Sequence, residues 1–412
     1  MIRDRNIVCV ASSWYDHPTS KHHVMRRLAA DNHVVWVNFH GSRRPGLSRS
    51  DAGLALRRLR RVWAGVQAVQ PGLDVLSPPV IPLPELRLAR RVNAWLLARW
   101  VRAALRRRSS RPVQVWLFTP DVPELLPYLP AERFVYYCVD DFAAFSGFNT
   151  ALMEQLEAQT LAAADVVITT SSRLYEERRT RHPAVHLVPH GVDFEHFAAA
   201  PTWPRDRLPA DVRSLPHPVL GYMGLVSDYV DLDLLAAAAR ARPTWTFVLV
   251  GDVRCRTDAL AGLRNVHLLG GRPYELLPAY CAAFDVGLIP FRMNRLVRAV
   301  NPIKLREYLA AGLPVVSAPL SEVLRYAPAV QTAARLPEFL AACQRALELA
   351  RGGRAADRQA LVRDEGWDRR VAELAELVMG AGGTPTGPAG APTPVRAAQR
   401  AAGCAAGAAR AG

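Results

Sequence analysis

Short runs of β-branched and aromatic residues alternate along this chain with segments of helical periodicity. In the first half, strands are expected at 6–12, 33–39, 113–119, 134–139, 165–170 and 185–188. Helices are expected between them at 21–30, 93–108 and 151–164, the second of these with Leu, Trp and Val on one face and Arg on the other. This alternation is typical of parallel βαβ units, in which each strand is reached by a helical crossover.

The same pattern restarts after a proline-rich stretch at 200–218, with strands expected at 218–224, 245–252, 265–270, 284–291 and 314–319. Two such halves predict an α/β protein with two Rossmann-like, doubly wound domains facing a cleft. The predicted parts are an N-terminal domain at 1–198, a linker at 199–217, a C-terminal domain at 218–364, a helix at 365–379 and a tail at 380–412. The tail consists almost wholly of Gly, Ala, Pro, Thr and Arg, so it is expected to be disordered.

The composition is that of a globular enzyme, with 412 residues, half of them hydrophobic and 22% charged. We find no apolar stretch long enough to span a bilayer and no secretory signal in residues 1–10, which predicts a cytoplasmic protein. The six cysteines are scattered and form no CxxC pair. This argues against a disulfide framework and against a structural zinc site.

The net charge of +15 is concentrated in residues 43–111, which hold sixteen arginines and three acidic residues. Two explanations stay open. One is the arginine usage of a GC-rich genome, and the other is a basic face for anionic lipid headgroups or an anionic acceptor. The second would place the protein peripherally on the inner face of the plasma membrane. Nucleic acid is not an expected partner, because no recognition motif accompanies the arginines.

The most informative segment is NPIKLREYLAAGLPVV at 301–316. Asn301 is a favourable N-cap, and Pro302 suits the first helical position, where its missing N–H has no partner to lose. Gly312 stands where a left-handed residue ends a helix. The segment predicts a short helix at the carboxyl end of the strand 284–290, which is the edge where open α/β sheets bind ligands.

Three polar residues of this segment, Asn301, Lys304 and Glu307, are spaced three apart. Lys304, near the helix N-terminus, adds a point charge to free backbone N–H groups, a combination that favours a diphosphate. Glu307, one turn deeper, can accept hydrogen bonds from both hydroxyls of a ribose. The alternative is a surface pair of i,i+3 residues, worth about 0.2–0.5 kcal/mol.

Other candidates follow expected strands. Gly224, in the turn GYMG, can let backbone N–H groups approach a diphosphate, although an ordinary tight turn has the same pattern. Asp140 and Asp141 end the strand 134–139. One of them is expected to act as a general base with a raised pKa and the other to bond locally, because successive residues point opposite ways.

The loop after the first strand is expected to line the acceptor side of the cleft, through Trp14, Asp16, His17 and Lys21. His190, where a strand becomes the linker, is expected either to reach the cleft or to be a core or hinge histidine. No metal site is predicted. His22 and His23 are neighbours on an expected helix, where successive side chains diverge by about 100°, so they cannot chelate one metal ion together.

Taken together, these motifs resemble the GT-B glycosyltransferases, especially bacterial members that build cell-surface polysaccharide. KLREYLAAGLPVV at 304–316 resembles their nucleotide-sugar helix, and HGVDF at 190–194 resembles the segment that closes their N-terminal domain. WYDHPTSKHHVMRRLA (14–29), CVDDFAAF (138–145) and EGWDRRVAEL (365–374) are also similar. The resemblance covers roughly residues 5–378. It implies that Glu307 holds the donor ribose and Lys304 its phosphates, and that the last helix crosses back onto the N-terminal domain.

The chain departs from the resembled family at one position. Many retaining members carry a second glutamate eight positions before the ribose glutamate, in contact with the donor sugar, and here that position is Ala299. The match is therefore to a sub-group in which Asn301 and the preceding loop, with Asn294 and Arg298, take over this contact. The donor sugar and the stereochemistry of transfer stay open.

The sequence thus predicts a glycosyltransferase that moves a sugar from a nucleotide-diphosphate sugar to a glycan or lipid-linked acceptor in cell-surface polysaccharide synthesis. No cofactor and no divalent cation are expected, because no DxD-type cluster stands at the predicted site. Two alternatives are a sugar-nucleotide epimerase or hydrolase on the same fold and a non-catalytic nucleotide-sugar-binding protein. A dehydrogenase is disfavoured, because no GxGxxG follows the first strand.

Overall fold

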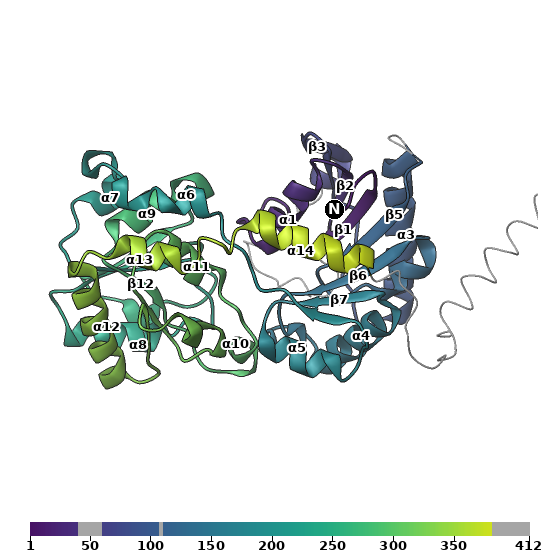
Figure 1. The fold of residues 1–412 in the computed structure, drawn as a ribbon. Helices are drawn as coiled ribbons and strands as arrows, with labels where there is room; N and C mark the ends of the chain where they lie inside the picture. The colour runs from purple at the N-terminus through teal and green to yellow at the C-terminus, as the bar shows by residue number, and fades with distance from the viewer. Residues whose placement is uncertain (40–59, 107–109, 381–412) are drawn as a thin grey trace, which may run out of the picture.

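The computed structural model describes residues 1–39, 60–106 and 110–380, which form two lobes with a sheet in each (Figure 1). Within this described part, the first sheet has eight strands in the order β3-β4-β2-β1-β5-β6-β7-β8, and the second has six in the order β11-β10-β9-β12-β13-β14. All neighbouring strands are parallel except β3 and β4. The predicted α/β fold with two doubly wound domains is confirmed.

The strands of the first sheet are β1 (Asn6–Ala11), β2 (His33–Asn38), β3 (Val66–Gln70), β4 (Leu73–Leu76), β5 (Val113–Leu117), β6 (Arg133–Cys138), β7 (Val166–Thr169) and β8 (Val185–Leu187). Those of the second are β9 (Val219–Met223), β10 (Thr246–Val250), β11 (Val266–Gly270), β12 (Val286–Ile289), β13 (Val315–Ser317) and β14 (Val330–Thr332). Strands β3, β4 and β14 are additions to the predicted set.

The helices that cover the first sheet are α1 (Ser20–Leu28), α3 (Arg87–Arg106), α4 (Thr150–Ala163) and α5 (Ser172–Arg179). The second lobe contains α6 (Phe194–Ala198), α7 (Ala210–Arg213), α8 (Leu232–Ala241), α9 (Leu277–Ala283), α10 (Arg295–Arg298), α11 (Ile303–Ala310), α12 (Leu336–Arg351) and α13 (Ala355–Ala360). The chain continues into α14 (Trp367–Gly380). None of the helices described has the length and hydropathy that crossing a membrane requires.

Both faces of the first sheet are covered, and its strands β1, β2 and β7 are buried along their whole length. Ile7 and Cys9 of β1 pack on the side of α1 and α14, whereas Val8 and Val10 pack on the side of α3. Two-sided burial explains why these strands read as continuous apolar runs without polar alternation.

Helix α14 leaves the second lobe and lies over the first, as Figure 1 shows in yellow. Val192 N donates to the carbonyl oxygen of Glu365 at 2.9 Å, and Trp367 N donates to that of Val192 at 3.2 Å. Trp367 and Leu374 are then buried in the core that α1 forms with the first sheet. The C-terminal segment therefore ties the two lobes together.

Some sequence predictions fall outside the described residues, namely the disordered tail beyond residue 380 and the arginines of 43–59, 107 and 108. The proline-rich stretch predicted as a linker forms short helical turns between Ala200 and Arg213, and Val212 is buried in the core of the second lobe.

Candidate active site between the two sheets

The two sheets present their carboxyl ends to each other, and polar side chains from both meet there. From the first lobe come Asp140, after β6, and Lys21, at the start of α1. From the second come Lys304 and Glu307 of α11. The charges of Glu307 and Asp140 both act to raise the pKa of Lys304, and the charge of Asp140 acts to raise the pKa of Lys21. The structure therefore brings residues from distant parts of the sequence into one charged cluster.

Helix α11 has the predicted boundaries at its C-terminus but not at its N-terminus. Gly312 adopts φ +75° directly after the last turn, as predicted. The helix begins at Ile303, so Pro302 occupies the cap position, and the prediction that Asn301 is the N-cap was wrong. The reason is that the Asn301 amide has other partners. Its Nδ2 donates to Thr170 O at 2.7 Å, and its Oδ1 accepts from Arg306 at 2.7 Å.

Lys304 lies against two aromatic rings, with its Nζ 5.4 Å from the centroid of Tyr222 and 5.1 Å from that of Phe291. No carboxylate of a described residue lies within ion-pair distance of it. Burial lowers the pKa of Lys304, and the nearby Glu307 opposes this shift. The ammonium group is thus a partly desolvated cation available to an anionic ligand.

Glu307 is 9% exposed, yet among the described residues its carboxylate has neither a hydrogen-bond donor nor an ion-pair partner. Burial raises the pKa of Glu307, Lys304 lowers it in part, and Asp193 of the HGVD segment raises it further. A buried carboxylate without a donor is energetically unfavourable unless a ligand supplies one. Two hydroxyl groups of a bound molecule would meet this need.

Gly224 lies beside Lys304 and adopts φ +139°, where side chains are strained. A methyl group on it would be 2.9 Å from Lys304 Cε, so a larger residue would displace the lysine. Gly251, which directly follows β10, has φ +155° and packs against the Gly224 carbonyl, because a methyl group on it would lie only 2.0 Å from that oxygen. Sequence reasoning missed Gly251, although it follows a buried strand in the same way as Gly224.

Asp140 and Asp141 have different environments, as the alternation rule predicts. Asp141 is buried and accepts from Arg295 of α10 at 2.7 Å, with Arg178 at 3.9 Å. Asp140 is half-buried and faces the charged cluster. Burial raises the pKa of Asp140 to about 7, although Lys21 counteracts this shift. Of the two predicted catalytic carboxylates, Asp140 is therefore the one that faces the cluster.

The loop after β1 divides into two parts. Asp16 and His17 are exposed, and His17 lies 6.0 Å (ring centroids) from Tyr274 of the second lobe. Lys21 is half-buried, and burial lowers its pKa. The ring of Trp14 packs edge-on against that of Trp36, with the ring centroids 5.0 Å apart.

His190 is buried close to Trp367, with the ring centroids 6.2 Å apart. Burial lowers its pKa to about 3, and Arg306 and Arg370 lower it further. This matches the hinge alternative of the sequence analysis, since His190 lies where α14 joins the two lobes.

Ala299, which replaces the second glutamate of the resembled family, is 1% exposed and belongs to the core on the α3 side of the first sheet. Asn294 caps α10 through Val297 N at 2.8 Å, and Arg298 is exposed. The segment before α11 thus turns toward the first lobe, which sequence reasoning did not predict.

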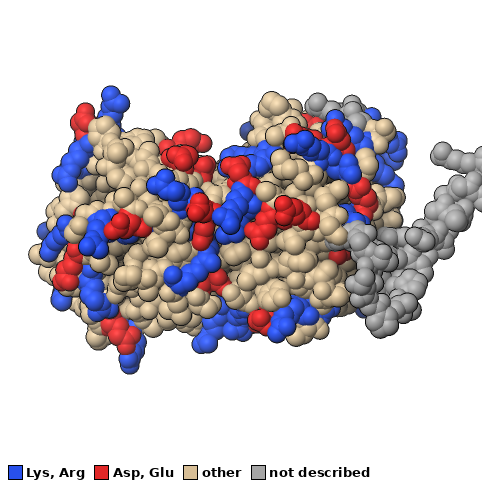
Figure 2. All heavy atoms as spheres, viewed as in Figure 1, with Lys and Arg blue, Asp and Glu red and all other residues tan. Residues whose placement is uncertain are grey.

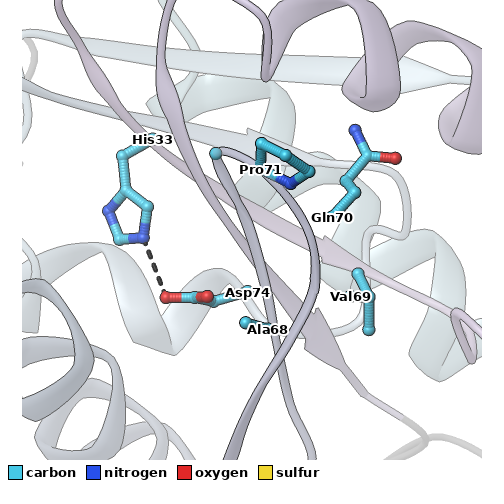
Figure 3. Close-up of a pocket in the computed structure, with 7 residues that line it drawn as sticks. His33, Ala68, Val69, Gln70, Pro71 and Asp74 are labelled. Atoms are coloured by element: carbon cyan, nitrogen blue, oxygen red, sulfur yellow. Dashed lines mark hydrogen bonds and ion pairs between the residues drawn. The ribbon is translucent and has the colours of Figure 1, made fainter.

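A separate hollow of about 290 Å³ lies at the amino ends of β2 and β4, on the opposite edge of the first sheet (Figure 3). His33 Nε2 lies 3.0 Å from the Asp74 carboxylate, and His33 Nδ1 lies 3.3 Å from Asn6 Oδ1. These buried groups bond to one another and join three strands. None of the predicted site residues lines this hollow.

The comparisons with known proteins agree with this arrangement. Residues 217–349 match the family model described as glycosyl transferases group 1. A relative from Bacillus subtilis (strain 168), TuaH, is 28% identical over 253 residues. It is named as a teichuronic acid biosynthesis glycosyltransferase, an assignment that its name marks as provisional. That match covers 57% of this chain, and the chain spans 63% of the relative's length.

Among solved structures, sucrose-phosphate synthase from Thermosynechococcus elongatus superposes with a TM-score of 0.67 at 16% identity, covering 91% of this chain and 98% of that one. Anabaena HepE in complex with UDP-glucose gives 0.63 at 15% identity, covering 91% and 99%. At these identities the likeness concerns the fold. The chain shares its fold with these solved structures, and its residues 217–349 match the model of the group 1 glycosyl transferases.

Proposed function

We propose that this chain is a glycosyltransferase that moves a sugar from a nucleotide-diphosphate sugar to a glycan or lipid-linked acceptor in cell-surface polysaccharide synthesis. The observation that carries the proposal is the pairing, on one short helix, of an aromatic-flanked cation with a buried carboxylate that lacks a donor, Lys304 and Glu307. The match of 217–349 and the relative TuaH support it.

In this proposal the second lobe binds the donor. Glu307 accepts hydrogen bonds from the ribose hydroxyls, and Lys304 stabilises the diphosphate as negative charge develops on it. Gly224 allows the backbone to approach the phosphates, since any side chain there would displace Lys304. Asn301 supports the site indirectly, because both ends of its amide bind protein groups. The solved neighbour that holds UDP-glucose makes UDP-sugars the first donors to test.

Asp140 is proposed as the general base that takes the proton from the acceptor hydroxyl. Its raised pKa suits this role, because a base is most effective when its pKa is near the working pH. Asp16, His17 and Lys21 lie on the acceptor side. We propose that no divalent cation is needed, since Lys304 and backbone N–H groups supply the positive charge.

A donor panel with an acceptor-dependence readout tests the proposal. UDP-, GDP- and dTDP-sugars are incubated with the full-length chain, with and without lipid-linked glycan acceptors from cell membranes, and products are identified by mass spectrometry. Transfer that requires acceptor is the expected result. Turnover without acceptor would instead indicate an epimerase or hydrolase, and binding without turnover would indicate a non-catalytic protein.

We further propose that the protein works in the cytoplasm, peripherally on an anionic membrane. The positions 88, 91, 95, 99 and 102 of α3 recur every three or four residues and share its solvent face. Leu88 is 74% and Trp95 47% exposed. The three arginines of this face make no ion pair within the described chain. An uncompensated basic face with exposed Leu and Trp suits anionic headgroups.

Figure 2 shows basic side chains along the outer margin of the first lobe, in keeping with such a face. Flotation with phosphatidylcholine vesicles, with and without phosphatidylglycerol, tests it. Wild-type protein is expected to float only with the anionic vesicles, and the variant R91E/R99E/R102E is expected to stay at the bottom of the gradient. The control R335E/R351E/R354E makes the same charge change on the second lobe and should still float. Equal flotation of the wild type with neutral and with anionic vesicles would refute the membrane proposal.

A further inference from the structure

The segment between β12 and α11, residues 290–302, is bound to the first lobe although it belongs to the second. Ser171 Oγ donates to the carbonyl oxygen of Ala299 at 2.6 Å, and Asn301 Nδ2 donates to that of Thr170 at 2.7 Å. Ala299 itself is buried in the first-lobe core. The contacts join the lobes close to the charged cluster, independently of α14.

Arg295 of α10 adds two ion pairs to these links. Its Nε lies 2.7 Å from Asp141 Oδ2, and its Nη1 lies 2.9 Å from Glu154 Oε1 of α4. The Asp141 side chain is only 5% exposed, whereas that of Arg295 is 51% exposed. Because a charge-assisted hydrogen bond to a buried carboxylate is short and directional, this link fixes the position of Asp141.

Asp141 directly follows Asp140 in the chain, so the two residues share a peptide bond. The two side chains leave the end of β6 in different directions, one toward Arg295 and the other toward Lys21 and Lys304. A displacement of Asp141 would therefore move Asp140 relative to the donor-binding helix. Since transfer depends on the separation of base, acceptor and donor, such a displacement would slow the reaction.

We propose that Arg295 is a positioning residue for transfer, which holds Asp140 in the charged cluster by anchoring Asp141 across the lobe boundary. The inference rests on the proposed function, because it assigns Arg295 a role in that reaction. It does not require Arg295 to touch either substrate. The donor-binding residues Lys304 and Glu307 lie on another element of the same lobe and would keep their places when Arg295 is replaced.

The test compares Arg295→Ala with Arg292→Ala. Arg292 is a matched control, because it stands on the same segment but pairs with Asp231 and Asp233 of its own lobe. Arg295→Ala is expected to lower kcat about 10- to 100-fold while the affinity for the donor stays within about twofold. Arg292→Ala should change neither quantity by more than about twofold. Arg295→Lys, which keeps the charge, should restore part of kcat.

Small-angle X-ray scattering without substrate gives a second readout. Arg295→Ala is expected to increase the radius of gyration and Arg292→Ala to leave it unchanged, because of these two arginines Arg295 pairs with the first lobe and Arg292 pairs within its own lobe. Equal kcat and equal scattering of the two variants would overturn the inference. So would a loss of donor affinity as large as the loss of kcat. Failure of the wild type to transfer any sugar would instead defeat the proposed function, and the scattering result would still test the link.

Discussion

At the scale of single residues, burial sets the protonation of the candidate site. Burial raises the pKa of Asp140 to about 7 and raises that of Glu307, and it lowers the pKa of Lys304. Ionisable groups with strongly shifted pKa values are concentrated at the functional sites of proteins. Here they come from both lobes, so the chemistry depends on how the two lobes meet.

These shifts predict a bell-shaped pH dependence of kcat/KM. Activity should rise as pH increases through about 7, because Asp140 must lose its proton to act as a base. It should fall at higher pH, below the ordinary range of a lysine, as Lys304 loses the charge that stabilises the diphosphate. Initial rates measured from pH 5 to pH 10 check this.

The variant Asp140→Asn tests whether Asp140 is the group that controls the acidic limb of this pH profile. It is expected to lower kcat about 10²- to 10⁴-fold, the usual contribution of a general base, and to remove the rise through pH 7. An unchanged acidic limb in Asp140→Asn would show that another group controls it.

The sequence analysis was most successful where one residue's role follows from spacing. Lys304 and Glu307 are spaced three apart, and both lie in the charged cluster. It predicted that Asp140 and Asp141 diverge but not which one faces the cluster, because that depends on Arg295, 154 positions away. Asn301 failed as a cap for the same reason, since Thr170 lies 131 positions away.

At the scale of elements, the segment 290–302 distinguishes this chain from the pattern it resembles. In many retaining members a glutamate at the position of Ala299 contacts the donor sugar. Here that position is buried in the first lobe, where a carboxylate would have no access to a ligand. Under the proposed function other groups contact the donor sugar, and Asp140 is the first-lobe carboxylate whose charge acts on Lys304.

The substitution Ala299→Glu tests this account. Adding the missing glutamate is expected to lower the free energy of unfolding by at least about 3 kcal/mol, because it buries an unpaired charge, and to reduce activity. Thermal unfolding and transfer rates measure the two effects. Ala241→Glu, the same substitution at an exposed position at the end of α8, serves as the control and should be tolerated. A stable and more active Ala299→Glu would show that position 299 faces the donor.

Long periodic elements could be predicted from the sequence, whereas three of the short strands could not. Residues 93–108 were predicted as a helix from their apolar face, and α3 begins six residues earlier at Arg87. Strands β3, β4 and β14 have three to five residues each, too few to show a period. Their pairing is determined by neighbouring strands rather than by local pattern.

At the scale of the whole molecule, α14 and the segment 290–302 are two separate ties between the lobes. Trp367 begins α14 and is 1% exposed, with its ring stacked on His23 at 5.0 Å. Gly191 passes directly beneath it, since a methyl group there would lie 2.8 Å from the ring. The HGVD segment and the final helix therefore form one packed unit. Figure 2 shows acidic and basic side chains along the junction on this face.

Removing the ring should destabilise this unit. Trp367→Ala is expected to lower the free energy of unfolding of the first lobe by about 3–5 kcal/mol, because it opens a cavity in a core. Differential scanning calorimetry would show the transition moving to lower temperature. Glu376→Ala, on the exposed face of the same helix, is the control. Equal transitions for the two variants would mean that α14 packs elsewhere.

The measurement that tests the central claim most directly is calorimetric titration of a UDP-sugar panel into the wild type, Lys304→Ala, Glu307→Ala and the exposed control Glu348→Ala. The account predicts that one donor binds the wild type and the control Glu348→Ala with the same affinity. Lys304→Ala and Glu307→Ala should each weaken that binding about 10- to 100-fold, because each removes hydrogen bonds to a charged group. Equal affinity of all four proteins for the donor would contradict the assignment of α11 as the donor-binding helix.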